Sequence, residues 1–238
     1  MNTLTTPVAL VAGADGGLGL EVARQLSLTG AVVLVAARTA EAAKGAVVDL
    51  PALEALGVDL DVTDDESVLA AVAAVVAAHG RLDILVNATA CADPAGTPSG
   101  ATTRTDLEEA LRQFEVALFG AWRLTKAFLP LLEASAHPRV VNVSNGAGSH
   151  GDPLHGLAAR GGADAAYGVG AAGLNALTSL LAAELATGGI LVNAVCPESP
   201  VAGTRGPATS APGVVWAATL PDDGPTGGFF RDGAALPW

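Results

Sequence analysis

The chain has 238 residues, half of them hydrophobic, which suits one globular domain with a sizeable core. Its 24 acidic and 12 basic residues give a net charge of −12, which disfavours nucleic acid and anionic membrane surfaces as partners. Two cysteines, Cys91 and Cys196, are too few for a disulfide framework, and free thiols are typical of a reducing cytosol. No basic segment precedes the first apolar run, and the apolar run 68–78 is too short to cross a bilayer. We therefore expect a cytoplasmic protein without a membrane partner.

Short apolar runs alternate with helical patterns along the whole chain. Continuous β-branched runs of this kind are typical of strands buried on both faces, and they predict strands near 7–12, 31–36, 82–86, 139–143 and 190–195. Regular alternation of strands and helices favours a parallel, doubly wound α/β sheet with right-handed crossovers. Because no repeat or linker divides the chain, we predict one Rossmann-like domain over residues 1–238.

The first predicted strand is followed by the glycine-rich segment AGADGGLG and then a helical pattern. Gly13 would permit a tight turn, while Gly17 and Gly19 would let the backbone approach a pyrophosphate held at the helix N-terminus. Asp15 and Leu18 belong to the same turn and are further candidates for contact with a nucleotide. A plain glycine-rich turn is the alternative, but the order strand, turn and helix favours dinucleotide binding.

Residues after the next two strands bear on the type of nucleotide. Arg38 follows the second strand, where an acidic residue would bind a ribose 2′-hydroxyl and an arginine suits a 2′-phosphate. If a nucleotide binds, NADP(H) is therefore expected rather than NAD(H), although Arg38 could equally be a solvated side chain. Asp61 and Val62 are expected at the end of the third strand, near an adenine, and Asp61 could instead cap the following loop.

Two long segments rich in glycine or proline interrupt the alternation, at 145–166 and 197–213. Both follow the carboxyl ends of predicted strands, where ligands bind in open α/β sheets, and loops of this length are often functional lids. The first leads into an alanine-rich helical stretch with Tyr167 near its start. A tyrosine in this setting suggests an acid for a carbonyl substrate.

Taken together, these motifs resemble the short-chain dehydrogenase/reductase family, in its carbonyl-reductase-like branch. The matching segments, in chain order, are AGADGGLG, LDVTD, LDILVN, RVVNVS, AYGVGAAGLNALT and LVNAVCP. The resemblance covers nearly the whole chain and implies a single Rossmann domain that uses NAD or NADP. It also implies that Asn87 and Pro197 lie beside the cofactor. Family members pair through long helices, but some carbonyl-reductase-like members are monomers, so a monomer and a homo-oligomer are both expected possibilities.

The family's catalytic tetrad of asparagine, serine, tyrosine and lysine is matched only at Tyr167. Ala117 stands in the asparagine's place, Ala171 in the lysine's, and Asn145 in the serine's, while Ser144 could substitute only if the strand end shifted register. In the family, the lysine lowers the pKa of the tyrosine, holds the nicotinamide ribose and passes protons through a water held by the asparagine. Since the pKa of an unperturbed tyrosine is about 10, Tyr167 is expected to stay protonated and to act as a hydrogen-bond donor or weak acid. Asn145 could donate a second hydrogen bond to the same oxygen.

Other departures add candidate groups and weaken the cofactor site. Ala90 replaces a family glycine after the fourth strand, so any NADP(H) binding is expected to be weak or vestigial. His150 and His155 are candidate general bases, with a solvated loop position as the alternative for each. Their spacing with Asp152 offers no third ligand, so no metal is expected. Glu198 replaces a glycine after the sixth strand, where it could move a proton or block the nicotinamide pocket.

Three functions remain open from the sequence. The first is a non-redox enzyme that isomerises, cyclises or eliminates on a small carbonyl or enol substrate, with Tyr167 and Asn145 holding the oxygen and a histidine or Glu198 moving the proton. The second is an NADPH-dependent carbonyl reductase with an atypical site, favoured by the glycine turn and Arg38. The third is a catalytically silent binding protein. The missing lysine and asparagine place the non-redox enzyme first.

Overall fold

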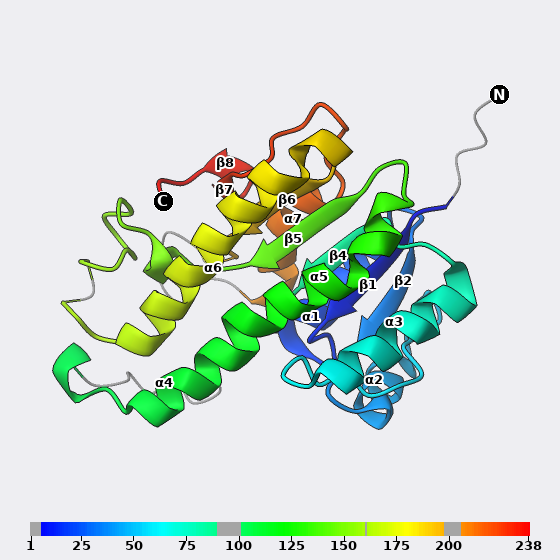
Figure 1. Ribbon diagram of the computed structural model, residues 1–238, viewed down its shortest axis with the longest axis horizontal. Helices are drawn as coiled ribbons and strands as arrows, with labels where there is room; N and C mark the ends of the chain where they lie inside the picture. The colour runs from blue at the N-terminus through cyan, green and yellow to red at the C-terminus, as the bar shows by residue number, and fades with distance from the viewer. Residues whose placement is uncertain (1–5, 90–100, 160, 198–205) are drawn as a thin grey trace.

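A twisted sheet forms the centre of the molecule in the computed structural model, which describes residues 6–89, 101–159, 161–197 and 206–238 (Figure 1). The strand order is β3-β2-β1-β4-β5-β6-β7-β8. Neighbours from β3 to β7 run parallel, and only β8 pairs antiparallel, with β7. The predicted Rossmann-like α/β sheet is therefore confirmed. The strands are β1 Val8–Ala12, β2 Val32–Ala36, β3 Leu53–Ala55, β4 Ile84–Asn87, β5 Arg139–Val143, β6 Leu191–Val195, β7 Phe229–Arg231 and β8 Ala234–Ala235.

Helices cover both faces of this sheet. Packing against one face are α3 Asp65–His79, α5 Gly120–Glu133 and α6 Ala165–Leu185, and against the other α1 Gly17–Ser27, α2 Ala40–Val47 and α7 Pro207–Ala218. The helix α4 Leu107–Phe114 joins α5 through a π-helical segment, η2 Glu115–Phe119. A short 3-10 turn, η3 Gly146–Gly148, follows β5, and others are η1 Thr102–Arg104 and η4 Ala186–Gly188.

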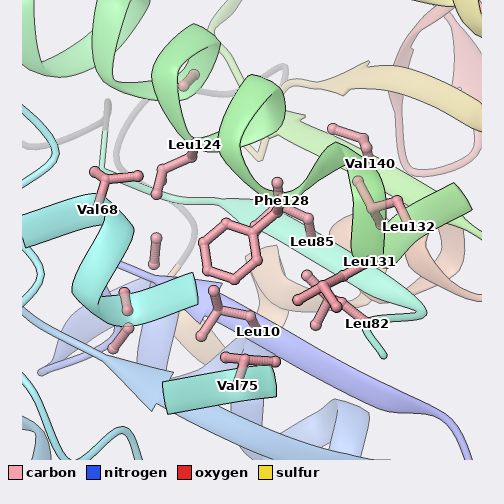
Figure 2. Packing of buried hydrophobic residues seen from close by; sticks show 14 of the residues in the cluster. Leu10, Val68, Val75, Leu82, Leu85, Leu124, Phe128, Leu131, Leu132 and Val140 are labelled. Carbon is pink, nitrogen blue, oxygen red and sulfur yellow. The ribbon is translucent and has the colours of Figure 1, made fainter. Parts of the chain in front are cut away.

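The two cores follow from strand geometry, because successive side chains of a strand point to opposite faces. In β1, Leu10 belongs to the core under α3, α5 and α6, whereas Val11 belongs to the core under α1 and α7. Phe128 of α5 is fully buried at the centre of the first core, among leucine and valine side chains (Figure 2). Burying a side chain of this kind stabilises the fold by about 1.5–3 kcal/mol.

The five strands expected from the sequence agree with the structure to within two residues at each end, but the third strand differs. Its regular part ends at Ala55, so Asp61 and Val62 lie in the turn before α3 rather than at a strand end. The chain still follows β2 after Ala55, through bonds from Leu56 N to Val35 O and from Leu60 N to Ala37 O. These bonds are too widely spaced to form a regular ladder, so the strand ends at Ala55. The apolar pattern of the sequence does not show this spacing.

The helix α6 is the most apolar of the long helices in the described residues. The stretch Ala165–Gly188 has the length and composition of a membrane span, and an 18-residue apolar window within it is 44% buried inside the protein. Its buried stripe, which includes Leu174, Leu177 and Leu181, joins the core above the sheet. Core packing thus explains the apolar character of this stripe, while Val169 and Leu180 of the same helix are exposed.

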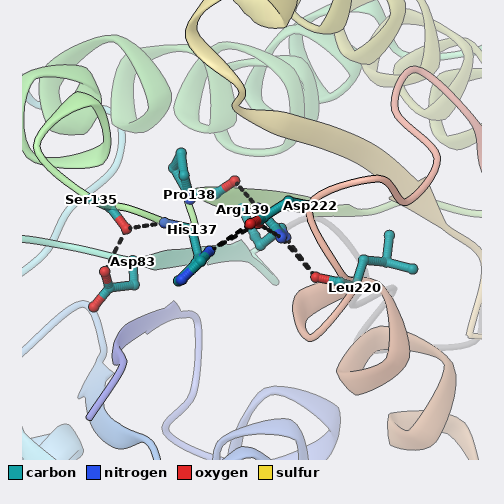
Figure 3. A network of polar contacts seen from close by, with 7 residues as sticks. All are labelled: Asp83, Ser135, His137, Pro138, Arg139, Leu220 and Asp222. Atoms are coloured by element: carbon teal, nitrogen blue, oxygen red, sulfur yellow. Dashed lines mark hydrogen bonds and ion pairs between the residues drawn. The ribbon is translucent and has the colours of Figure 1, made fainter. Parts of the chain in front are cut away.

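A polar network joins segments at the amino ends of β4 and β5 (Figure 3). The buried guanidinium of Arg139 donates to the carbonyl oxygen of Leu220 at 2.7 and 2.9 Å and to Asp222 at 2.7 Å. Asp222 also meets the ring of His137 at 2.8 Å. Hydrogen bonds from Arg139 and His137 hold the pKa of Asp222 below its usual range. The network connects the segment after α7 to the start of β5. It lies at the amino ends of the strands, the end of the sheet opposite Tyr167.

We expect Asp222→Asn to lower the free energy of unfolding by about 1 kcal/mol. The effect is modest because the Asp222 carboxylate is mostly exposed and Arg139 keeps its bonds to Leu220. Urea denaturation at pH 7 measures the loss, with Asp223→Asn as the matched control on the neighbouring exposed residue. Equal stability of the two variants would contradict the role given to Asp222.

Candidate functional site

The glycine-rich turn after β1 has a backbone that only glycine accommodates. Gly13 has φ +76° and Gly17 has φ +54°, both in the left-handed region that favours glycine. A methyl group on Gly19 would overlap the carbonyl oxygen of Gly13, and one on Gly13 would lie 3.0 Å from Cα of Thr89. In contrast, a methyl group on Gly17 would meet nothing within 4 Å. The turn is thus tightly packed at Gly13 and Gly19 and has free space at Gly17.

The start of α1 leaves backbone donors for a ligand. No side chain caps this helix at Gly16, and first-turn N–H groups of a helix lack an intrahelical acceptor. Asp15 is exposed in this turn and Leu18 is half-buried. Nearby, Asn87 Oδ1 and Thr89 Oγ1 at the end of β4 are buried without a hydrogen-bond partner among the described residues. A helix N-terminus beside unsatisfied polar atoms fits a dinucleotide, with its pyrophosphate at α1.

The turn that holds Asp61 is organised by its own hydrogen bonds. Oδ1 of Asp61 accepts from the backbone N of Thr63 at 2.9 Å and from its hydroxyl at 2.7 Å. These bonds hold the pKa of Asp61 below its usual range, helped by the charges of Arg38 and Arg123. The structure thus shows the loop-capping role for Asp61, and it places the exposed Arg38 near enough for its charge to act on Asp61.

Val62 is fixed by contacts to α5. It is buried, and a methyl group on Gly120 would lie 2.6 Å from its side chain. Arg123 donates to the carbonyl oxygen of Val62 at 2.6 Å and to Glu115 at 2.9 Å. The turn that holds Asp61 and Val62 and the helix α5 therefore form one packed unit.

Tyr167 lies in the first turn of α6, half-buried. One turn later Ala171 is buried, and a methyl group on Gly148 would lie 2.5 Å from the Ala171 carbonyl carbon. The η3 turn therefore rests directly on the backbone of α6, which sets the spacing between the end of β5 and Tyr167.

Ser144 and Asn145 have different hydrogen-bond partners in the structure. Pairing of β5 with β6 runs regularly to Val143, and Ser144 N bonds Val195 O, so the strand end has not shifted register. Ser144 donates its hydroxyl to Asn175 of α6 at 2.6 Å. Asn145 is 2% exposed, and its Oδ1 accepts from Ala147 N at 2.7 Å. This bond occupies Oδ1 and leaves the amide nitrogen as the other polar atom of the side chain.

Ala117 lies in the π-helical segment η2. This segment packs on α6, where Leu118 lies against Gly173, and Phe114 at the end of α4 lies against Gly170. π-Helical bulges are often found at functional sites. Here the bulge is present although the asparagine is absent, and it brings the segment of Ala117 to the part of α6 that carries Ala171.

The other sequence candidates do not form one cluster. His150 is exposed and its backbone N bonds Trp238 O, whereas Nε2 of His155 is buried without a partner among the described residues. A methyl group on Gly146, next to Asn145, would lie 3.0 Å from Cβ of His155. Pro197 is buried directly after β6. Glu198 lies outside the described residues, and within them no three acidic, histidine or cysteine side chains are placed to hold a metal ion.

A buried ion pair, which the sequence did not predict, holds together several segments near Asn145. Arg231 of β7 meets Asp152 at 2.9 Å and Cys196 Sγ at 3.4 Å, and all three residues are buried. Gly146 N also donates to this sulfur, at 3.2 Å. Burial raises the pKa of Asp152. Hydrogen bonds from Leu154 N, Arg231 and His155 N lower it by more, so the pKa lies below its usual range. One guanidinium thus joins the segments that carry Asn145, His155 and Pro197.

We expect Asp152→Asn to lower the free energy of unfolding by about 2 kcal/mol, because Arg231 would stay buried without its counter-ion. A carboxyl with a lowered pKa stabilises the fold above its unfolded pKa, and this contribution is lost as the pH falls through the folded pKa. The stability difference should therefore be complete at pH 7 and shrink below about pH 4.

Denaturation of both proteins across this pH range measures the effect, with Asp49→Asn at an exposed turn as the control. A difference that grows as the pH falls would contradict the assignment.

Comparison with known proteins gives the class that this fold and site define. Residues 7–208 match the family model described as short chain dehydrogenase. The chain is 37% identical over 211 residues to a Streptomyces virginiae protein whose name assigns it to ketoacyl reduction in the monensin polyketide synthase, over 85% of this chain and 75% of that one. It is 32% identical over 190 residues to the Escherichia coli 3-oxoacyl-(acyl-carrier-protein) reductase, over 80% and 72% of the two chains.

A solved structure of comparable extent has the same fold. The NADPH-bound carbonyl reductase from chicken fatty liver superposes with a TM-score of 0.81, at 22% identity, over 99% of this chain and 100% of that one. The chain therefore belongs to the short-chain dehydrogenase/reductase family. The two relatives described above are both named as reductases of ketoacyl groups.

Proposed function

We propose that the chain binds NADPH and reduces the carbonyl group of a small molecule. The observation that carries the proposal is the turn from Gly13 to Gly19, which keeps a tightly packed base and an uncapped helix start beside unsatisfied polar atoms of β4. The ketoacyl reductases among its relatives support the same reaction. This ranking reverses the one drawn from the missing lysine and asparagine alone.

The cofactor would lie along the carboxyl ends of β1, β2 and β4. N–H groups at the start of α1 would hold the pyrophosphate, and Arg38 the 2′-phosphate. Val62 would form a wall of the adenine site, while Asn87 would lie beside the cofactor at the end of β4. When bound, NADPH supplies the hydride.

The proton would come from Tyr167. Its phenol would donate a hydrogen bond to the substrate oxygen and then transfer the proton as negative charge develops there. The amide nitrogen of Asn145 would hold the same oxygen, because Ala147 N already occupies its Oδ1. Reduction consumes this proton and needs a protonated phenol. A site without the lysine therefore remains able to reduce, with slower return of the proton to Tyr167 from solvent.

We expect Arg38→Leu to weaken NADPH binding about tenfold and to leave NADH binding nearly unchanged. An exposed arginine beside a 2′-phosphate contributes a charge-assisted bond that NADH cannot make. Titration of tryptophan fluorescence with each cofactor gives the two affinities, and Arg24→Leu on α1 is a control for the loss of charge. Tighter binding of NADH than of NADPH by the unmodified chain would contradict the role of Arg38.

The non-redox enzyme is a second candidate. It is favoured by two alanines, Ala117 and Ala171, which occupy both ends of the family's proton relay. Tyr167 and Asn145 would then hold an enolate oxygen while His155 moved the proton. This chemistry needs no hydride. The two candidates therefore differ in whether a hydrogen atom from C4 of NADPH appears in the product.

Transfer of deuterium from NADPH labelled at C4 separates the candidates. The chain is incubated with NADPH that carries deuterium at both C4 positions and with a panel of β-ketoacyl thioesters and activated ketones, and the products are analysed by mass spectrometry. The reductase predicts one deuterium on the former carbonyl carbon. Conversion of a substrate without label would support the non-redox enzyme, and no conversion with any substrate would favour a binding protein.

A further inference from the structure

The backbone of Gly146, the residue after Asn145, lies directly against the buried pair of Arg231 and Asp152. A methyl group on Gly146 would lie 2.7 Å from Nη2 of Arg231 and 3.2 Å from Oδ2 of Asp152. The N–H of Gly146 donates to Sγ of Cys196 at 3.2 Å, and the same sulfur accepts from Nη2 of Arg231 at 3.4 Å. The guanidinium therefore holds Gly146 by direct packing and through the sulfur.

The turn that begins at Gly146 orients the side chain of Asn145. Oδ1 of Asn145 accepts from the backbone N of Ala147 at 2.7 Å, and its carbonyl oxygen accepts from the backbone N of Gly148 at 3.0 Å. Both donors belong to η3, whose first residue is Gly146. Because Gly146 joins Asn145 to these donors, a displacement of Gly146 would change the direction in which the amide nitrogen of Asn145 points.

The energetics of the ion pair favour a positional effect over a stabilising one. Arg231 is 9% exposed and Asp152 is 5% exposed, and Nε of Arg231 is buried without a partner among the described residues. The lost hydration of two buried charges offsets much of their attraction, and apolar side chains of similar volume are often equally stable in such places. A buried pair with an unsatisfied donor therefore adds little stability, whereas its contacts with Gly146 fix the geometry beside Asn145.

We propose that Arg231 is a positioning residue, which acts through Gly146 and aims the amide of Asn145 at the substrate oxygen. The inference rests on the function proposed for Asn145. A displacement of about 1 Å in a positioned group can lower a rate about a hundredfold, so loss of the pair should lower kcat. NADPH affinity should stay nearly unchanged, because the glycine turn and Arg38 follow other strands, β1 and β2.

Arg231→Met combined with Asp152→Leu removes the pair without leaving one buried charge alone. We expect this double variant to keep nearly the same stability and to lower kcat about tenfold. In the background of Asn145→Ala, itself about a hundredfold slower, the same two changes should alter kcat less than about twofold, because the group that they position is absent. Cys196→Ala removes only the sulfur and should give the same pattern, so it serves as the test if the double variant does not fold.

Arg139→Met is the matched control, because it removes a buried arginine at the amino ends of the strands. It should lower the free energy of unfolding and leave kcat of the folded protein unchanged. Amide hydrogen exchange adds a readout that needs no turnover. The N–H of Ala147 is held by Oδ1 of Asn145, so it should exchange at least about tenfold faster in the double variant, while the amides of β5 keep their rates.

Four results would each overturn the proposal: an unchanged kcat in the variants, an equal loss of kcat in the Asn145→Ala background, an equal loss in Arg139→Met, or an unchanged exchange rate at Ala147. If the unmodified chain oxidises no NADPH with any substrate, the proposed reductase fails. The exchange rate at Ala147 still decides in that case whether Arg231 positions Asn145.

Discussion

Replacing Tyr167 with phenylalanine is expected to lower turnover about a hundredfold and to leave NADPH affinity nearly unchanged. The phenol is the only group assigned to give up a proton, and a hydrogen bond to a developing oxyanion contributes roughly 3 kcal/mol to the transition state. Phenylalanine keeps the ring in the first turn of α6, so packing there is preserved. Steady-state kinetics with the best substrate of the panel measures the loss.

Two controls make the Tyr167→Phe result specific. Fluorescence titration with NADPH should give the same affinity in both proteins, and thermal unfolding should give the same midpoint to within a few degrees. His150→Gln, at an exposed position, should keep full turnover. If Tyr167→Phe reduced substrate as fast as the unmodified chain, another group would be the proton donor, and His155 would be the first to examine.

Restoring the relay should act in the opposite direction. We expect Ala117→Asn combined with Ala171→Lys to raise turnover ten- to hundredfold, because general acid catalysis contributes about 10²–10⁴ and is best when the pKa of the acid lies near the working pH. An ammonium one turn from the phenol would lower its pKa and hold the nicotinamide ribose. The packing of η2 on α6 places the two substituted positions in neighbouring segments.

The matched control for the double variant is Ala183→Lys, which adds the same charge at an exposed position of the same helix. It should leave turnover unchanged. Because reduction needs a protonated phenol, activity of the double variant should fall off at a lower pH than activity of the unmodified chain. Unchanged turnover in a folded double variant would contradict a reductase limited by its missing relay and would favour the non-redox enzyme.

Local patterns were sufficient to predict most of the fold. Apolar runs located β1, β2, β4, β5 and β6, and the glycine spacing located the turn before α1. The end of the third strand was wrong, because backbone bonds to β2 continue past Ala55 without forming a ladder. Capping by Asp61 was one of two alternatives that the sequence left open.

Contacts between distant segments could not be predicted in the same way. Arg231 and Asp152 are 79 residues apart, and neither lies in a motif that marks it as one half of a buried pair. Cys196 was expected only to be a free thiol, and the structure adds its contacts with Gly146 and Arg231. Asn175 had no local signal either, since only its hydrogen bond from Ser144, 31 residues away, marks it.

Oxidation of NADPH by the unmodified chain tests the central claim most directly. Absorbance of NADPH is followed with β-ketoacyl thioesters, activated ketones and quinones, beside Tyr167→Phe at the same concentration. The account predicts steady, enzyme-dependent oxidation with at least one substrate, slowed about a hundredfold by Tyr167→Phe. Conversion of a carbonyl substrate at an unchanged NADPH concentration would contradict it.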